Sequence, residues 1–302
     1  MTDPSRAVLA IDIGGTKVAF ADVEDDRVSN RHQVPTPRTG RGADLVDTIA
    51  AEVSRRDPSG VAIATTGMVS GGALTALNPS TLPIENGFPL ARCIEAVTGL
   101  KATLVNDAHA AGWGEYKFGA GRGFRNFMFV TVSTGVGGGL ILEGRLQLGR
   151  TGLAGHVGHV SVPGAMTLCG CGRKGCLETV ASGTAIARRF RDGSGRDVAT
   201  PEVFVAASEG DTLAERVIDE SAAALAVAFA DAVATVDLDV IALGGGVGLA
   251  TGFLGRVRKW TSQLPPVFRR EIVRAQAGPD AGLIGAASLS GENFHQISVV
   301  DK

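Results

Sequence analysis

The chain has 302 residues, of which 44% are hydrophobic and 20% are charged, and its formal net charge at pH 7 is -2. This length predicts about two domains of ~150 residues, each with a sizeable core. A balanced charge without a basic, aromatic-rich run argues against a nucleic-acid partner. No apolar run approaches the ~18 residues of a membrane span, and no signal-like segment opens the sequence. We therefore expect a cytoplasmic protein with no membrane partner.

The first predicted elements are a strand, a glycine turn and a second strand. An apolar run at 8–13 leads into GGTK, and the apolar pattern resumes in VAFADV, which predicts a hairpin. Helical spacing of apolar residues at 44–55 and 88–98 predicts two helices, with GVAIATTG as a buried strand between them. ATLVNDAHAAGWGEY predicts a strand that runs into a helix through Asn106 and Asp107.

A second unit is predicted to begin near Phe118 with the same design. NFMFVTVSTGVGGGLIL again reads as strand, glycine turn and strand. An alanine-rich helix is predicted at 211–236, DVIALGGGVG is a buried strand that ends in glycines, and DAGLIGAASL starts a last helix. Two copies of the strand–turn–strand design predict a duplicated α/β fold with a cleft between its halves.

Three glycine turns follow predicted strands. In DIGGTK, at 12–17, backbone N–H groups can point at phosphate oxygens, and the Thr16 hydroxyl and Lys17 ammonium add charge-assisted hydrogen bonds. A single glycine hairpin is more often structural. STGVGGG at 133–139 and GGGVG at 244–248 repeat the pattern, and the last suits the close approach of an adenosine. Together the three turns predict nucleotide binding.

A histidine and three of the four cysteines lie close together in the sequence. His159, Cys169, Cys171 and Cys176 supply one imidazole and three thiolates, the ligand set of a closed tetrahedral Zn²⁺ site. Their spacing is too tight for a disulfide framework. Free thiols in a glycine-rich turn are the alternative. Cys93 stands alone and is expected to fill apolar space.

DIGGTK, STGVGGG, the Gly-His plus C-x-C-x4-C block and LGGGVG together resemble the ROK family of sugar kinases, repressors and open reading frames. The resemblance extends from Leu9 to about Ser290. It implies a two-domain actin-like or Hsp70-like ATPase fold of duplicated ribonuclease H-like units, with a central cleft and a zinc-bound loop. It also implies ATP with Mg²⁺ against the glycine turns, a structural Zn²⁺, and a homodimer or homotetramer.

The domain limits follow from the elements and from this resemblance. Residues 1–117 are expected to form a smaller N-terminal α/β domain, completed by a C-terminal helix at 281–302. Residues 118–280 are expected to form the larger α/β domain, which carries the zinc loop at 159–178.

The resemblance also implies roles for individual residues. Asp107 would be the catalytic base that accepts a proton from the sugar hydroxyl. By the residues alone, Asn-Asp before an alanine-rich run is equally a helix cap. The expected ATP and phosphate ligands are Asp12, Gly14, Gly15, Thr16, Lys17, Thr134, Gly135, Gly137, Gly245 and Gly246.

A second implied set contacts the sugar. It consists of Gly67, Asn78, Asn106, Asp107, His156, His159 and Glu178. Without the resemblance, Asn78 reads as a turn residue before proline and Glu178 as an acid in the first turn of a helix. His109 is expected to be an ordinary helix residue.

One position departs from the usual family pattern. Most members read E-x-G-H where this chain reads H-V-G-H, so His156 replaces a carboxylate. A neutral imidazole can donate one hydrogen bond and accept another, which suits the amide of an N-acetyl group. Bacterial members that phosphorylate N-acetylmannosamine at O6, giving N-acetylmannosamine 6-phosphate in sialic acid catabolism, carry this AGHxGH variant. The resemblance therefore implies this small-molecule sugar as the substrate.

Three alternatives differ from that expectation. Glucose or another hexose or N-acetylhexosamine can be the substrate, because one fold hosts many specificities. A sugar-sensing repressor is disfavoured, since the family's repressors carry a helix-turn-helix before the first glycine turn and seven residues precede Val8 here. An actin-like ATPase is disfavoured by the cysteine block and Asp107.

Overall fold

The computed structural model describes residues 7–78 and 81–291. The chain divides into two compact units. Unit 1 comprises Met1–Arg122, Arg145–Ala154 and Gln276–Lys302, and unit 2 comprises Gly123–Gly144 and Gly155–Ala275. The short segment 145–154 belongs to unit 1 although the chain on both sides of it lies in unit 2.

Unit 1 is built on a five-stranded sheet with strand order β3-β2-β1-β4-β7. Its strands are β1 (Val8–Ile13), β2 (Lys17–Glu24), β3 (Arg27–Pro35), β4 (Val61–Thr65) and β7 (Ala102–Asn106). β1 pairs antiparallel with β2, as the predicted hairpin requires, and parallel with β4. All five residues of β4 are buried, as expected of a strand covered on both faces. The small hairpin of β5 (Met68–Ser70) and β6 (Ala73–Thr75) follows β4.

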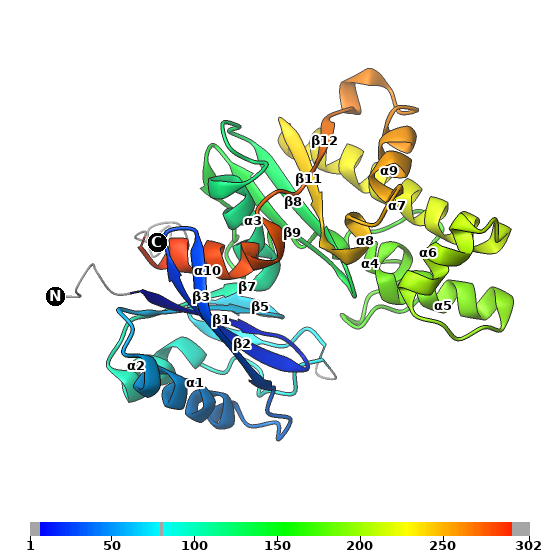
Figure 1. Cartoon of the computed structure of the whole chain (residues 1–302). Coiled ribbons are helices and arrows are strands. Elements are labelled where there is room, and N and C mark those ends of the chain that lie inside the picture. Colours follow the sequence, from blue (N-terminus) through cyan, green and yellow to red (C-terminus); the bar gives the residue numbers. More distant parts are fainter. Residues whose placement is uncertain (1–6, 79–80, 292–302) are drawn as a thin grey trace. The chain divides into compact units, whose positions relative to one another are not determined.

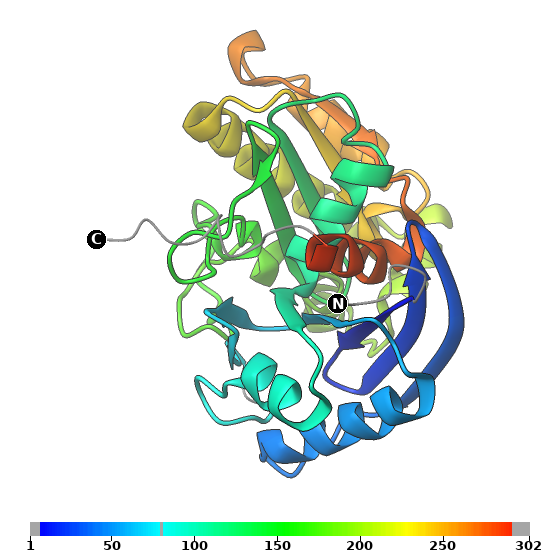
Figure 2. The ribbon, with the colours of Figure 1, turned by 90° about the vertical axis from the view of Figure 1, so that its left-hand side faces the viewer.

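Helices cover both faces of this sheet. Figure 1 shows α1 (Gly42–Arg56) and α2 (Leu90–Thr98) on one face and α10 (Ala281–Gly291) on the other. α10 also packs on α3 (Asp107–Phe118), and the view in Figure 2 agrees. The approach is close, because a Cβ on Gly285 would lie 1.8 Å from the Ala110 carbonyl oxygen. The predicted last helix is described as far as Gly291, and residues 292–302 of the expected 281–302 helix lie outside the described residues.

Unit 2 repeats the same strand arrangement. β8 (Phe127–Val132) pairs antiparallel with β9 (Val136–Leu142) and parallel with β11 (Val240–Gly244), and β12 (Glu271–Arg274) pairs parallel with β11. The order β9-β8-β11 therefore matches β2-β1-β4 of unit 1. The two-residue strand β10 (Arg145–Leu146) opens the 145–154 segment. The predicted duplication of an α/β unit is confirmed, and with it the actin-like fold class.

The core of unit 2 lies between its sheet and a group of helices centred on α7 (Thr212–Val236). The Asp211 side chain caps α7 by accepting from the N–H groups of Leu213 and Ala214. The other helices are α4 (Glu178–Ala181), α5 (Gly183–Ser194), α6 (Thr200–Ser208), α8 (Gly245–Gly248) and α9 (Phe253–Thr261). Within the described ranges, short 3₁₀ turns lie at Val157–His159, Pro266–Phe268 and, in unit 1, Gly278–Asp280.

A buried glutamate fastens two segments of unit 1 beside the points where the chain passes between the units. Glu115, near the end of α3, is 1% exposed. Its Oε2 accepts from the N–H groups of Ala120 and Gln276, both at 3.0 Å, and its Oε1 accepts from Ala277 at 2.7 Å. One carboxylate thus satisfies backbone donors from two segments that are far apart in the sequence.

Replacing this glutamate should destabilise the protein strongly. We expect Glu115→Ala to lower the free energy of unfolding by about 2–4 kcal/mol, because three buried N–H donors lose their acceptor. Glu115→Gln, which keeps one acceptor oxygen, should lose less. Urea denaturation measures both. Glu95→Ala is the control, since this exposed glutamate accepts a single N–H, from Ala102 at 3.2 Å. A loss for Glu115→Ala no larger than for Glu95→Ala would contradict the assignment.

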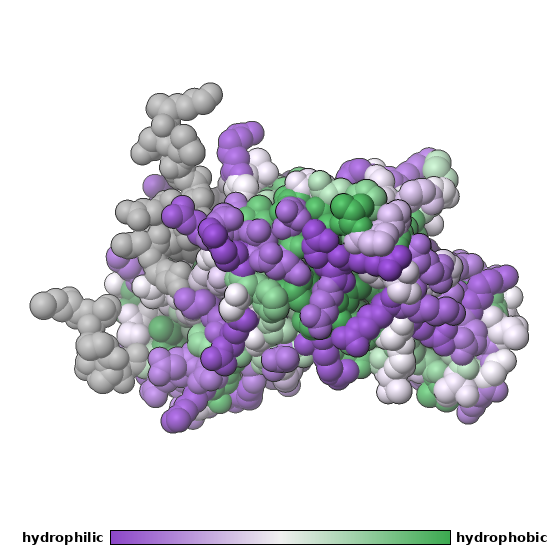
Figure 3. Space-filling model, turned by 90° about the horizontal axis from the view of Figure 1, so that it is seen from above, coloured by the Kyte–Doolittle hydropathy of each residue, from purple (hydrophilic) through white to green (hydrophobic). Residues whose placement is uncertain are grey.

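Among the described residues, none of the helices has both the length and the apolar character needed to cross a bilayer. The face viewed in Figure 3 carries mainly hydrophilic residues, with hydrophobic residues between them.

Candidate functional site

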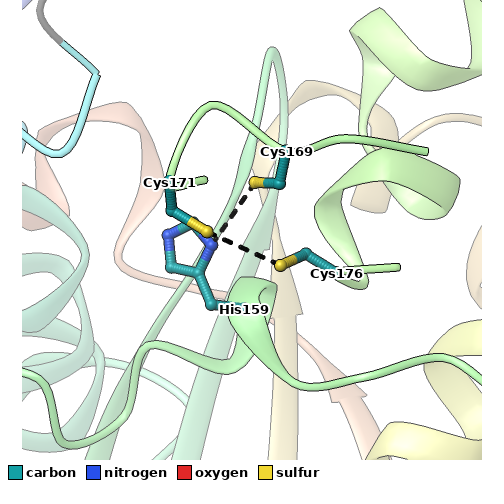
Figure 4. A group of neighbouring side chains, drawn as sticks. All are labelled: His159, Cys169, Cys171 and Cys176. Carbon is teal, nitrogen blue, oxygen red and sulfur yellow. Dashed lines mark hydrogen bonds between the residues drawn. The ribbon is translucent and has the colours of Figure 1, made fainter. Parts of the chain in front are cut away.

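The predicted zinc ligands come together in unit 2. Figure 4 shows the imidazole of His159 and the thiols of Cys169, Cys171 and Cys176 gathered around one point. Their ligand atoms all lie within 4.8 Å of one another. The distance from Cys169 Sγ to His159 Nδ1 is 3.7 Å, and the distance from Cys171 Sγ to Cys176 Sγ is also 3.7 Å.

This arrangement fits a zinc ion. Zinc–sulfur and zinc–nitrogen bonds of about 2.3 and 2.1 Å at tetrahedral angles place two ligand atoms roughly 3.6–3.8 Å apart. The observed 3.7 Å separations agree with that value. Four protein ligands leave no open position, so the ion would hold the loop rather than react. Burial raises the pKa of the Cys169 thiol to about 12, so zinc binding there must displace a proton.

Backbone contacts shape the loop around these ligands. The Cys169 N–H donates to the Arg173 carbonyl at 2.7 Å, and the Arg173 guanidinium donates to the His159 carbonyl at 2.7 Å. Gly175 has a φ of 71°, and a Cβ there would lie 2.3 Å from the Ala165 carbonyl oxygen. The loop therefore needs glycine at this position for both its backbone conformation and its packing.

In unit 1, Asn106 and Asp107 lie where β7 runs into α3. The Asn106 Oδ1 accepts from the N–H groups of Ala108 and His109, so the cap anticipated from the sequence is formed by Asn106. Its Nδ2 donates to the Gly67 carbonyl at 2.9 Å. Gly67 has a φ of 100°, which favours glycine. A sugar contact at Asn106 would have to share an amide that already has protein partners.

The Asp107 carboxyl is the most perturbed acid of the candidate site. Its pKa is raised to about 6, first by desolvation and second by the neighbouring Asp12 carboxylate. The N–H of Ala108, which donates to Asp107 Oδ1 at 2.7 Å, opposes this rise. A carboxyl group with this pKa is mostly ionised at pH 7 and can still accept a proton readily, as a general base requires.

Asp12 is the second-last residue of β1, just before the first glycine turn of unit 1. Desolvation raises the pKa of Asp12, and the Lys17 ammonium partly offsets the rise. Asp12 is solvent-exposed. The desolvation therefore comes from protein atoms around the carboxyl group that exclude part of its hydration, not from complete burial. The turn closes with the Gly14 N–H donating to the Lys17 carbonyl at 3.0 Å, and a Cβ on Gly15 would lie 2.7 Å from the Thr81 carbonyl oxygen. Thr16 and Lys17 are exposed.

The second and third glycine turns meet in unit 2 at the ends of adjacent parallel strands. The turn after β8 contains Ser133, Thr134 and Gly135, and Thr134 is exposed. The third predicted turn, after β11, is the short helix α8 in the structure. It begins at Gly245, whose φ is 83° and whose Cβ would lie 2.4 Å from the Val132 carbonyl oxygen. Gly246 next to it is exposed, and Gly137 lies in β9 opposite Thr131. Exposed backbone at paired strand ends is the arrangement expected of a phosphate site.

The two histidines of the GHVGH segment also lie together in unit 2. The rings of His156 and His159 stack with centroids 6.3 Å apart at an interplanar angle of 17°. Glu178 follows the cysteine loop and begins α4, and Cys169 Sγ lies 3.8 Å from its Oε1. The predicted sugar contacts of this unit, His156, His159 and Glu178, are thus grouped around the metal site.

Asn78 and His109, both considered in the sequence analysis, lie in unit 1. Asn78 is exposed in unit 1, where its carbonyl accepts from the Thr81 N–H at 3.0 Å. His109, expected to be an ordinary helix residue, is 1% exposed, and its Nε2 lies 2.6 Å from the Ala154 carbonyl oxygen. It therefore fastens the 145–154 segment to α3. No local pattern in the sequence signals that contact, because its partner lies 45 residues away.

Comparison with known proteins identifies the family. The model of the ROK family matches residues 8–293, so this chain belongs to the ROK family. It is 47% identical to the N-acetylmannosamine kinase of Yersinia pestis (strain Pestoides F), over 92% of this chain and 96% of that protein.

Two solved structures share the fold. The ROK hexokinase from Thermus thermophilus is 33% identical with a TM-score of 0.82, covering 93% of this chain and 96% of that one. The ROK family glucokinase from Streptomyces griseus, solved in complex with glucose and AMPPNP, is 33% identical with a TM-score of 0.77, covering 94% and 98%.

Proposed function

We propose that this protein transfers the γ-phosphoryl group of ATP to the O6 hydroxyl of N-acetyl-D-mannosamine. The observation that carries the proposal is Asp107, a carboxyl group at a strand end with a pKa raised to about 6. The 47% identity to an N-acetylmannosamine kinase supports the choice of sugar. The product would be N-acetylmannosamine 6-phosphate. Because the reaction consumes ATP, we place it in the cytoplasm.

In the proposed mechanism Asp107 is the general base. Its carboxylate accepts the proton of the O6 hydroxyl as that oxygen attacks the γ-phosphorus of ATP, and the bond from this phosphorus to the bridging oxygen breaks to release ADP. Asn106, which caps α3, fixes the backbone beside the base. A proton acceptor held by a helix N-terminus has little freedom to leave its position, and this preorganisation lowers the entropic part of the barrier.

The proposed nucleotide-binding segments are the glycine turns of unit 1 and those of unit 2. In unit 1 the turn presents the exposed Lys17 ammonium and Thr16 hydroxyl beside the Asp12 carboxylate, a set that suits phosphate oxygens and a divalent cation. In unit 2 the turns at Thr134 and Gly245 present backbone at paired strand ends. Mg²⁺ bound with ATP would neutralise charge on the phosphates.

The structural zinc would act indirectly. With all four positions filled by His159 and the three cysteines, it would fix the loop that carries His156 and Glu178. The proposed sugar contacts are these two residues together with Gly67, Asn78, Asn106, Asp107 and His159. The sugar and ATP are the proposed small-molecule partners, and a homodimer or homotetramer remains the predicted assembly.

His156 is the residue proposed to recognise the N-acetyl group of the sugar. In wild type we expect kcat/KM for N-acetylmannosamine to exceed that for glucose, N-acetylglucosamine and fructose. His156→Glu should shift the preference toward glucose by about 10–100-fold, because a carboxylate can accept hydrogen bonds from adjacent hydroxyls but cannot donate one to an acetyl carbonyl. A coupled ADP assay over the four sugars measures the shift.

The matched control is His32→Gln, on an exposed histidine of β3. This variant should keep the wild-type order of sugars. An unchanged sugar profile in His156→Glu would remove the role of His156. A wild-type preference for glucose would replace the proposed substrate with that of a ROK glucokinase. ATP hydrolysis that is indifferent to every sugar would instead favour an ATPase.

A further inference from the structure

Glu178 makes a contact that its expected role as a sugar ligand does not require. Its Oε2 accepts a hydrogen bond from the backbone N–H of Val136 at 3.1 Å. Val136 is the first residue of β9 and directly follows the glycine turn at Thr134 and Gly135. Glu178, at the end of the zinc loop, therefore holds one end of the proposed phosphate turn, within unit 2.

The turn is shaped around this carboxylate. A Cβ on Gly135 would lie 2.5 Å from Glu178 Oε2. Gly135 is not among the residues with a positive φ, so its backbone conformation is open to any residue. Among the described contacts, it is the Glu178 carboxylate that leaves no space for a side chain there. The Glu178 carboxylate can occupy its position because residue 135 is a glycine and has no side chain.

Further contacts of the turn come from the next helix. The Gly183 N–H donates to the Ser133 carbonyl at 2.7 Å, and the Thr184 hydroxyl donates to the Thr134 carbonyl at 2.9 Å. Both belong to the start of α5, which follows α4 directly. Glu178 adds the contact on the β9 side of the turn, so the turn is held from both of its ends.

The position of Glu178 is set by the cysteine loop. Cys176 lies two positions earlier, and its carbonyl accepts from the Thr179 N–H at 2.9 Å and from the Thr179 hydroxyl at 2.7 Å. The other carboxylate oxygen, Oε1, lies 3.8 Å from Cys169 Sγ, on the side of the metal site. The two oxygens of Glu178 therefore face different parts of the site.

We propose that Glu178 is a positioning residue that couples sugar binding to nucleotide binding. Oε2 holds the phosphate turn through the Val136 N–H, and Oε1 receives a sugar hydroxyl. A sugar bound at Oε1 fixes the carboxylate, and the fixed carboxylate orders the turn that receives ATP. Coupling of this kind is reciprocal, so ATP must tighten sugar binding by the same factor, which for typical couplings is about 5–150. This inference rests on the proposed function, which supplies both the sugar ligand and the nucleotide site.

The nucleotide arm is tested without any sugar. Isothermal titration calorimetry measures the binding of a non-hydrolysable ATP analogue to the zinc-loaded protein. We expect Glu178→Ala to weaken this binding by about 5–20-fold, because the Val136 N–H loses its acceptor and the turn loses its order. Glu178→Gln, which keeps one acceptor oxygen, should restore nucleotide affinity. Zinc content and melting temperature are measured on each variant, so that a collapsed loop is recognised.

The sugar arm uses a change on the phosphate turn. Gly135→Ala should weaken binding of N-acetylmannosamine by at least about 10-fold, because the new methyl group displaces Glu178 by steric contact. It should also abolish the mutual tightening of sugar and nucleotide. The control is Gly255→Ala in α9, where a Cβ would meet nothing within 4 Å.

Two results would overturn the proposal. One is a zinc-loaded Glu178→Ala variant that binds the ATP analogue with wild-type affinity. The other is a Gly135→Ala variant that binds the sugar as wild type does. If wild type binds no N-acetylmannosamine, the proposed substrate fails, while the effect of Glu178→Ala on the nucleotide analogue still decides the positioning role.

Discussion

Replacing Asp107 by asparagine should lower kcat by about 10²–10⁴-fold, the range that general acid–base catalysis contributes. The amide cannot accept the proton of the sugar hydroxyl, although it has nearly the same shape as the carboxylate. Because only the reacting proton is affected, sugar binding measured by calorimetry should persist, and Asp107→Ala should behave in the same way. Turnover is measured with the coupled ADP assay.

The control for this variant is Asp47→Asn, on an exposed position of α1. It should retain wild-type turnover. Full turnover in Asp107→Asn would show that another group accepts the proton, and the base would have to be reassigned. Loss of sugar binding together with turnover would instead show that Asp107 acts mainly by binding the sugar.

The raised pKa of Asp107 also predicts how activity and stability respond to pH. With a pKa of about 6, kcat/KM should fall close to tenfold per pH unit below pH 6, because the base becomes protonated. The folded pKa lies above the unfolded value of 3.8, so the folded state binds more protons between these values. The contribution of this group to stability is therefore fully present below pH 3.8 and is lost as the pH rises through 6.

A consequence is that Asp107→Asn should be more stable than wild type at neutral pH. A shift of this size corresponds to at most about 3 kcal/mol. The melting temperature of the variant should exceed that of wild type at pH 7–8, and the difference should shrink in acid. An inactive variant of higher stability would separate loss of chemistry from loss of fold. A variant that melts below wild type at pH 8 would contradict the raised pKa.

Loss of the metal site should have the second large effect. Cys176→Ser removes one of the four ligands around the point shown in Figure 4 and should abolish stoichiometric zinc. A metal present at 1,000 times its dissociation constant stabilises the folded state by about 4 kcal/mol. A loss of that size lowers the melting temperature by roughly 6 °C in a chain of this length. Atomic absorption and thermal denaturation measure the two effects.

Chelation of the wild-type protein should reproduce the same loss, and added zinc should reverse it. Cys93→Ser is the control, since Cys93 lies half-buried in α2 of unit 1 and is not one of the four clustered ligands. It should keep its zinc and melt close to wild type. A Cys176→Ser variant that melts like Cys93→Ser would mean that the loop is held by its backbone contacts without the metal.

The features that the sequence predicted are those whose partners lie close together in the chain. The hairpin of β1 and β2 is set by an apolar run, two glycines and a second apolar run. The metal cluster follows from four ligands in one loop, since residues so close in sequence have few ways to be far apart in space. The cap of α3 by Asn106 was likewise one of the two local interpretations of Asn-Asp.

The contacts that the sequence did not predict join residues that are distant in the chain. Glu115 receives the N–H groups of Gln276 and Ala277 across 161 and 162 positions, and His109 reaches Ala154 across 45. Both side chains lie in a helical stretch whose pattern gives no reason to single them out. Their partners are backbone atoms, which every residue possesses and no residue type marks.

The GHVGH segment and Glu178 show most clearly which features the sequence determines and which only the tertiary structure decides. The sequence by itself determined the ligand set of the metal, the three glycine turns and an acid at position 178, because each depends on residue type and local spacing. Only the tertiary structure decided that Glu178 Oε2 meets the Val136 N–H, 42 positions away. The physical reason is that a backbone hydrogen bond is fixed by how β9 and α4 pack, and packing depends on the whole core of unit 2 rather than on either segment.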